Sequence, residues 1–171
     1  MKTLRIILSI TIIVCCFIGC QEKKTIAELE EYRHQIAIEE KNIKIIELYA
    51  EEILNNGNLS LVDSIIGNEF VDPVSVAGEK GPEALKHVIS YFRSTFPDLK
   101  ITIDEIVNDK DKVAWKWTAH ATHQGEIFGI PPSGKTVKFS GIIIDNIIDG
   151  KIVQRQGIWD RLGLKEQLSE K

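Results

Sequence analysis

The second half of the chain alternates between apolar and polar residues, and this period of two restricts the fold more than any other feature. The alternation begins near Leu99 and is typical of strands that bury one face. The Asp149–Gly150 pair between the last two segments is typical of a two-residue hairpin turn. The sequence therefore predicts an antiparallel meander. Its expected strands cover residues 99–103, 113–123, 137–143 and 151–160.

Helical spacing replaces this alternation in the first half of the chain. Apolar residues recur at helical intervals from Ile43 to Leu54, and Asn55-Asn56-Gly57 provides a left-handed stop. Asn58 can cap a short second helix. A third helix opens at Gly81-Pro82-Glu83, with proline in its first turn, and ends before Pro97. Helices followed by a meander predict an α+β fold, with the helices on one face of a curved sheet.

A loop rich in glycine and proline separates two of the expected strands. In residues 125–134, Pro131 and Pro132 fix φ, while Gly129 and Gly134 permit backbone angles that other residues avoid. We expect a rigid loop that forms the rim of a cavity.

The first residues are typical of a secretory leader. Lys2 and Arg5 precede the uncharged run 6–18, which is shorter than the roughly 20 residues of a membrane span. Phe17-Ile18-Gly19-Cys20 resembles a bacterial lipobox, in which the cysteine is acylated. We expect a lipoprotein signal peptide over 1–19 and a domain in the cell envelope, periplasmic or at the surface, that a lipid on Cys20 anchors to the membrane. An uncleaved anchor or an ordinary secretory signal stays open.

The following segment, residues 20–41, is rich in charge and reads as a tether or a helix extension before the domain at 42–168. Such a helix would lift the domain from the bilayer. Two alternatives remain for this segment: a solvated helix with no function, and a helix that self-associates through Ile36 and Ile38.

Composition excludes several classes of function. A net charge of −4 argues against nucleic acid as a partner, because phosphates require clustered Lys and Arg. Cys15, Cys16 and Cys20 are the only cysteines, so the domain has neither a disulfide framework nor a zinc–thiolate site. The histidines lack the spacing of a metal site. We expect no metal and no cofactor.

Several short motifs occur in an order that resembles the SnoaL-like polyketide cyclases. These proteins, often called ester cyclases, belong to the nuclear transport factor 2-like superfamily, and the resemblance covers about Asn42 to Leu168. The motifs are Tyr49 with Asn56-Gly57-Asn58, Phe96-Pro97-Asp98-Leu99, His123-x-Gly125, residues 128–135, Asp149-Gly150-Lys151-Ile152-Val153, Asp160-x-Leu162-Gly163-Leu164 and Gln167-Leu168.

The resemblance implies a cone-like α+β fold whose sheet wraps a deep pocket, often with dimers formed through the sheet. For the characterised cyclases it implies an intramolecular aldol ring closure without metal or cofactor, with an aspartate as acid and base.

Asp160 is the candidate for this acid and base. By strand parity it shares a face with Gln154 and Gln156. If that face looks into a mostly apolar pocket, desolvation raises the pKa of the carboxyl group toward a value useful for proton transfer. In the alternative, Asp160 caps the terminal segment 162–168 or pairs with Arg161 or Arg155.

His123 is the second catalytic candidate. It lies in register with Trp115 and Trp117, so we expect it on the same wall, where it would polarise a carbonyl or hold Asp160 by a hydrogen bond. A structural role for this histidine stays open.

Further residues are expected to line the pocket around an apolar small molecule. The aromatic ones would stack a flat ligand, although aromatic groups also supply much of the core of a small domain. The pocket-lining candidates are Tyr49, Asp72, Trp115, Trp117, Phe128, Gln154 and Gln156.

The chain departs from the family pattern at one informative place. Members commonly carry Glu, His and Trp where this chain has Gln154, Arg155 and Gln156, and a histidine near 71–73 is absent. Asp72 remains as a second acid near the pocket mouth. The leading hypothesis is acid/base catalysis on a small carbonyl compound by a membrane-tethered domain. The alternatives are a non-catalytic binding lipoprotein and a dimerisation or scaffold module.

Overall fold

The computed structural model describes residues 2–72 and 79–169, with side chains from Thr25 onward. The chain divides into two units, Met1–Ile38 and Glu39–Lys171. Helix α1 (Lys2–Leu48) supplies the first unit and the first element of the second. Within the described ranges, no helix combines the length and the hydrophobicity that a membrane crossing requires. The side chain of Cys20 lies outside the described residues.

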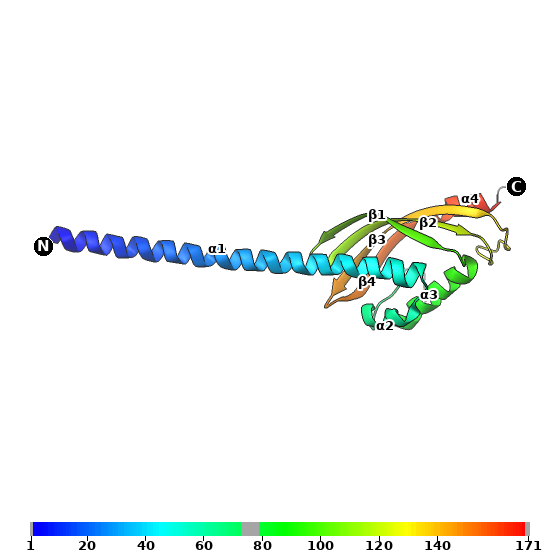
Figure 1. Cartoon of the computed structure of the whole chain (residues 1–171), viewed down its shortest axis with the longest axis horizontal. Coiled ribbons are helices and arrows are strands. Elements are labelled where there is room, and N and C mark those ends of the chain that lie inside the picture. Colours follow the sequence, from blue (N-terminus) through cyan, green and yellow to red (C-terminus); the bar gives the residue numbers. More distant parts are fainter. Residues whose placement is uncertain (1, 73–78, 170–171) are drawn as a thin grey trace. The chain divides into compact units, whose positions relative to one another are not determined.

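The helices of the second unit precede its sheet, except for a short helix at the end (Figure 1). After α1 come a π-helix, η1, and a 3₁₀ turn, η2. The helical elements that follow α1 are η1 (Tyr49–Asn55), η2 (Leu59–Leu61), α2 (Val62–Ile65), α3 (Gly81–Thr95) and α4 (Arg161–Ser169).

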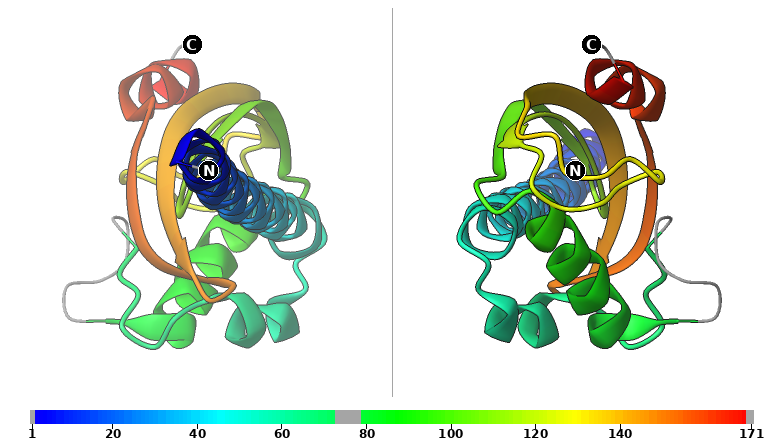
Figure 2. Two further views of the ribbon diagram at one scale, coloured as in Figure 1. Left: turned by 90° about the vertical axis from the view of Figure 1, so that its left-hand side faces the viewer. Right: turned by 90° about the vertical axis from the view of Figure 1, so that its right-hand side faces the viewer.

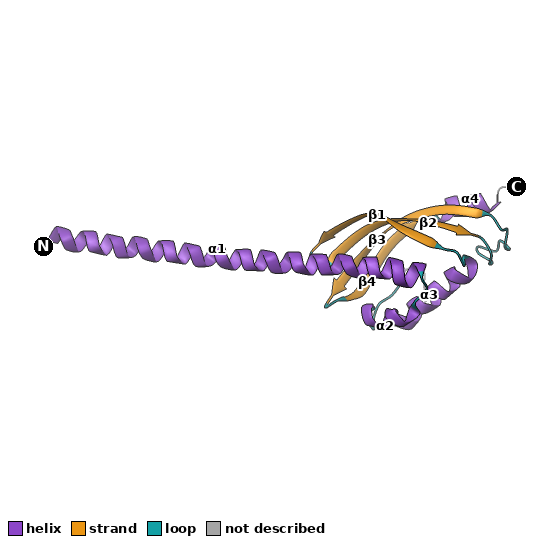
Figure 3. Ribbon diagram, viewed as in Figure 1, coloured by secondary structure: helices purple, strands orange, loops and turns teal. Residues whose placement is uncertain are grey.

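The sheet is a four-stranded antiparallel meander with the order β1-β2-β3-β4. Asp149 and Gly150 have positive φ angles of 51° and 78°, as the predicted two-residue turn requires. Figure 2 shows the curvature of the sheet, and Figure 3 separates it from the helical layer. The strands are β1 (Lys100–Asp109), β2 (Lys112–Thr122), β3 (Thr136–Ile148) and β4 (Lys151–Trp159).

The core lies between the inner face of the sheet and the helices. Because apolar residues alternate along each strand, one face buries them and removes their surface from water. The predicted α+β fold is confirmed, with helices packed on a curved antiparallel sheet. The large, fully buried side chains include Ile46, Ile53, Phe70, Leu85, Phe96, Trp115, Ile152 and Leu164.

One irregularity in β4 changes which side chains face the core. Ile147 pairs with Ile152 and Asn146 pairs with Gln154, so Val153 is an extra residue on β4. This β-bulge reverses the alternation beyond it. Arg155 is consequently turned inward.

Candidate functional site

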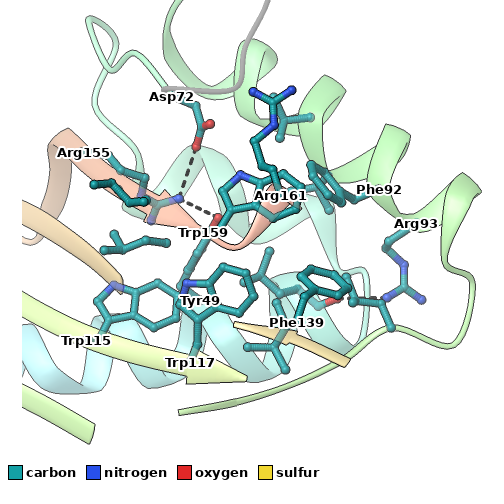
Figure 4. Close-up of a pocket in the computed structure, with 18 residues that line it drawn as sticks. Tyr49, Asp72, Phe92, Arg93, Trp115, Trp117, Phe139, Arg155, Trp159 and Arg161 are labelled. Atoms are coloured by element: carbon teal, nitrogen blue, oxygen red, sulfur yellow. Dashed lines mark hydrogen bonds and ion pairs between the residues drawn. The ribbon is translucent and has the colours of Figure 1, made fainter. Parts of the chain in front are cut away.

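A pocket of about 310 Å³ lies between α3, the η1 segment and the inner face of the sheet. Its volume is at the small end of the range for ligand sites, which suits a small molecule. Most of its lining is aliphatic or aromatic (Figure 4). The main apolar walls come from Ile89, Phe92, Trp115, Trp117, Phe139 and Trp159.

A buried polar network closes one end of this pocket. Arg155 donates from Nε to Asp145 Oδ1 at 2.8 Å and from Nη2 to Asp145 Oδ2 at 3.1 Å. Trp115 Nε1 donates to Asp145 Oδ2 at 3.0 Å, so both carboxylate oxygens are satisfied. Arg155 Nη1 donates to the Tyr49 hydroxyl oxygen at 2.8 Å. The bidentate geometry fixes the guanidinium firmly in the wall.

Asp72 reaches the same guanidinium from the opposite side. Its Oδ2 lies 3.4 Å from Arg155 Nη1, and the residue is only 4% exposed. Figure 4 shows Asp72, Arg155 and Tyr49 joined in this way. Among the lining residues that the structure describes, Asp72 is the one carboxylate. Asp72 is therefore the candidate base of this lining, and the Tyr49 hydroxyl is the other group there that can donate a proton.

Burial determines the protonation of this network. Desolvation raises the pKa of Tyr49 to about 12, although the charge of Arg155 opposes the shift. Burial disfavours the charge on Arg155, but Asp145 and then Tyr49 hold its pKa well above the usual arginine value. At neutral pH the network therefore presents a protonated phenol and a fixed positive charge.

The π-helix η1 places Tyr49 at the pocket. Helices of this type are rare and occur often at functional sites. At its far end, Asn55 accepts from Ile101 N at 2.7 Å and donates to Ile101 O at 3.0 Å, which ties η1 to the edge strand β1. Arg93 Nη1 donates to the carbonyls of Leu54 and Asn55, both at 2.9 Å. The bonds from Arg93 satisfy carbonyl groups that the end of η1 leaves open.

The loop between β2 and β3 packs against the end of α3. Gln124 N and Gly125 N both donate to Thr95 O, and a Cβ on Gly125 would lie 2.7 Å from Thr95 Cα. Phe128 and Gly129, with φ angles of 56° and 73°, form a tight turn. This turn stacks the Phe128 ring on Trp159, with ring centres 6.2 Å apart.

Phe128 lines an outer groove of about 540 Å³ rather than the pocket itself. Tyr49, Asp72, Trp115 and Trp117 do line the pocket.

Asp160 lies outside the pocket, and the expectation that it faces inward is wrong. The bulge at Val153 puts Arg155 on the inner face and leaves Gln154 and Gln156 exposed, so neither glutamine lines the pocket. The Asp160 carboxylate is exposed and accepts from Gly163 N at 2.8 Å. This is the geometry of a helix N-cap, the structural alternative for this residue.

His123 is fully buried but does not line the pocket. Its Nδ1 accepts from Ser133 N at 3.2 Å and lies 3.0 Å from Ser133 Oγ. Its ring packs beside Phe96, with centres 5.9 Å apart. Among the described residues, none forms a hydrogen bond with His123 Nε2, so no hydrogen bond joins this atom to Asp160. The two catalytic candidates are therefore not brought together.

Asp145 and Arg155 were not among the site residues expected from the sequence. A signal for Asp145 did exist, because it shares strand parity with Val137, Phe139 and Ile143 and therefore had to face the core. Arg155 gave no such signal, since only the bulge turns it inward.

The comparisons agree with this geometry. A model of the SnoaL-like polyketide cyclase family matches residues 44–168. The chain belongs to this family. Among its curated SnoaL-like relatives is the aklanonic acid methyl ester cyclase DauD of Streptomyces sp. (strain C5), which is 27% identical over 124 residues, covering 70% of this chain and 76% of the relative. The nogalonic acid methyl ester cyclase of Streptomyces nogalater is 24% identical over 121 residues, covering 68% and 89%.

Solved structures resemble this SnoaL-like domain as well. TsrD from Streptomyces laurentii matches with a TM-score of 0.68 and 30% identity, over 75% of this chain and 95% of TsrD. A protein of Acidithiobacillus ferrooxidans assigned as a polyketide cyclase matches with a TM-score of 0.67 and 28% identity, over 75% and 94%.

Metal ligands do not gather in the part of the chain that the structure describes. No group of three or more His, Cys, Asp or Glu side chains there is arranged to hold a metal ion.

Proposed function

We propose that this SnoaL-like domain binds a small apolar carbonyl compound and catalyses a ring closure of the aldol type. The observation that carries the proposal is the composition of the pocket, which is mostly apolar and gathers Tyr49, Arg155 and Asp72 at one end. Arg93 and Arg161 line it away from that end (Figure 4). The curated relatives are named as cyclases of polyketide methyl esters, which are carbonyl compounds. Membership of this family supports a cyclase-type function for the chain.

In this proposal the carbonyl oxygen of the ligand lies against Tyr49. The hydroxyl oxygen of Tyr49 accepts from Arg155, so the phenolic proton can be donated to the ligand. Because the pKa of Tyr49 is about 12, that proton is retained at neutral pH. The fixed charge of Arg155 strengthens the donor as negative charge develops on the oxygen.

Asp72 would then act as the base. It removes a proton from the carbon next to the carbonyl, the resulting enolate attacks a second carbonyl of the same molecule, and the new alkoxide takes up the proton. The role that the sequence suggested for Asp160 thus moves to Asp72, which lines the pocket beside the proposed oxyanion donors. No cofactor enters this scheme.

Incubation of the protein with aklanonic acid methyl ester tests the function. We expect a ring-closed product, detected by its absorbance and mass, together with quenching of tryptophan emission on binding. Trp115, Trp117 and Trp159 all line the pocket, so their emission reports its occupancy. The proposal would be contradicted if this ester and smaller β-keto esters gave no ring-closed product and no quenching.

A second candidate function is binding without catalysis. Two features favour it. Asp72, the one carboxylate of the described lining, is held in an ion pair with Arg155. Gly157, which lines the pocket two residues after Arg155 on β4, has no side chain that could take part in a reaction. Quenching without product formation would support this alternative.

We further propose that a lipid on Cys20 tethers the domain to a membrane of the cell envelope. The support is the sequence of residues 2–20, a basic start followed by an uncharged run and a lipobox-like end. Labelling with an alkyne analogue of palmitate should mark the wild-type protein and Cys16→Ser but not Cys20→Ser. Equal labelling of all three proteins would refute the anchor.

Pairing of two copies through the outer face of the sheet is a related proposal. This face exposes Ile142 (55%), Ile144 (44%) and Ile158 (83%), and Ile142 pairs directly with Ile158 across the strands. Exposed apolar patches of this kind mark interaction sites. Light scattering should show a dimer for the wild type and for Ser90→Glu on α3, and a monomer for Ile142→Glu. A wild-type monomer would refute the pairing.

A further inference from the structure

Arg161, the first residue of α4, lies where the pocket meets the outer groove. It lines both hollows, as do Val88, Phe92 and Trp159. Its guanidinium carbon is 5.4 Å from the centre of the Phe128 ring and 5.8 Å from the Trp159 ring. Such stacking on aromatic faces holds a cation in place while its N–H groups remain available. Figure 4 shows Arg161 beside Trp159 and apart from Arg155.

The two hollows adjoin each other, so the path of a ligand that occupies both runs past their shared walls. They share the walls named above, and Phe92 meets Trp159 edge to face with ring centres 6.0 Å apart. A ligand that fills the 310 Å³ pocket and continues outward must therefore pass Trp159 and Arg161. The outer groove adds Ile127, Phe128 and Tyr91 as further apolar surface.

The charges differ at the two ends of this path. At the buried end, Asp145 and Asp72 already pair with the single guanidinium of Arg155, so this end disfavours a permanently ionised anionic group on the incoming ligand. At the outer end, Arg161 has no ion pair with any residue that the structure describes. Glu79 also lines the groove, but its Oε2 lies 3.4 Å from His87 Nδ1 and does not pair with Arg161.

We infer that Arg161 is an anion-binding subsite, and that the ligand is an apolar ring compound with a neutral carbonyl at its buried end and an anionic group, such as a carboxylate, at its outer end. This inference rests on the proposed function, because it places the apolar body of the ligand in the same pocket. It adds the chemical class of the ligand and the orientation in which it enters.

The test uses two probes that differ only in charge. 1-Anilinonaphthalene-8-sulfonate carries an anionic group that N-phenyl-1-naphthylamine lacks, on the same ring system. Each is titrated into the full chain in nonionic detergent, and energy transfer from tryptophan to the probe reports binding. Since all three tryptophans line the pocket, probe dissolved in micelles away from the protein gives no signal.

The variants are Arg161→Gln, Arg161→Lys and the control Lys165→Gln, an exposed lysine one turn further along α4. For Arg161→Gln we expect the affinity for the sulfonate to fall about 3- to 10-fold, because the charged hydrogen bond lies near solvent, while the affinity for the neutral probe changes less than about twofold. Arg161→Lys should retain most of the affinity for the sulfonate, and Lys165→Gln should change neither probe.

Equal losses for both probes, no loss for the sulfonate, or the same loss in Lys165→Gln would overturn the inference. If Arg161→Gln fails to fold, salt provides the second measurement. The wild-type affinity for the sulfonate should fall between 0.02 and 0.5 M NaCl while that for the neutral probe does not, since screening acts only on the charged contact. An equal salt response of both probes would overturn the inference. Failure of the neutral probe alone to bind would instead contradict the proposed apolar pocket.

Discussion

At the scale of single residues, Arg155 determines what the pocket can do. A guanidinium does not lose its proton in a protein, so Arg155 acts as a fixed charge and donor and not as an acid or a base. Its two hydrogen bonds to Asp145 hold it in the wall, and Nη1 faces Tyr49 and Asp72. Proton abstraction is therefore left to Asp72, and Tyr49 is the donor to the ligand oxygen.

Asp145→Asn tests the structural part of this network. The substitution leaves Arg155 buried without its principal counter-charge, and breaking a buried ion pair in this way typically costs about 3–5 kcal/mol. We expect a loss of that size in the free energy of unfolding, measured by urea denaturation. Asp109→Asn, at the exposed end of β1, is the matched control and should change the free energy by less than about 0.5 kcal/mol. A loss below about 1 kcal/mol in Asp145→Asn would contradict this account.

The raised pKa of Tyr49 predicts that the free energy of unfolding depends on pH in the alkaline range. Its pKa rises from 10.0 to about 12 on folding, because burial disfavours the phenolate. The folded state therefore holds the proton more tightly, so the stabilisation is complete below pH 10 and is lost as the pH rises through about 12. The difference in unfolding free energy between the wild type and Tyr49→Phe should shift across this range in favour of the variant. A constant difference from pH 8 to pH 12 would show that Tyr49 titrates equally in both states.

At the scale of elements, the bulge in β4 decides which residues form the site. Without the extra residue Val153, strict alternation would place Gln154 and Gln156 inside and Arg155 outside. A period of two read from the sequence cannot detect one inserted residue, because the surrounding segments keep their own alternation. The strand itself was predicted correctly, but the face of its second half was wrong.

The start of α4 gives the element-scale prediction. Asp160 accepts from Gly163 N, so Asp160→Ala removes an N-cap and should lower the unfolding free energy by about 1 kcal/mol. Asp160→Asn should retain the stability, because asparagine caps a helix as well as aspartate does. Thermal unfolding of both variants measures the difference. Equal stability of Asp160→Ala and the wild type would argue against the capping role.

At the scale of the whole molecule, the sequence was enough for the fold because many independent signals agreed on it. The helix opening at Gly81-Pro82, the Asp149–Gly150 turn and the alternation of β2 are all local features, and each survives in the structure. The polar end of the pocket is different in kind. It joins Tyr49, Asp72, Asp145 and Arg155 from four separate segments, and their contact depends on packing that no local pattern contains.

One measurement tests the central claim, that the working end of the pocket is the one formed by Asp72, Arg155 and Tyr49. The rate of ring closure of aklanonic acid methyl ester is compared in the wild type, Asp72→Asn and Asp160→Asn, with tryptophan quenching to verify that each variant binds the ester. We predict that Asp72→Asn lowers the rate by about 10²- to 10⁴-fold, as expected for the loss of a general base, and that Asp160→Asn stays within about twofold of the wild type. Full activity in Asp72→Asn together with a large loss in Asp160→Asn would contradict the claim.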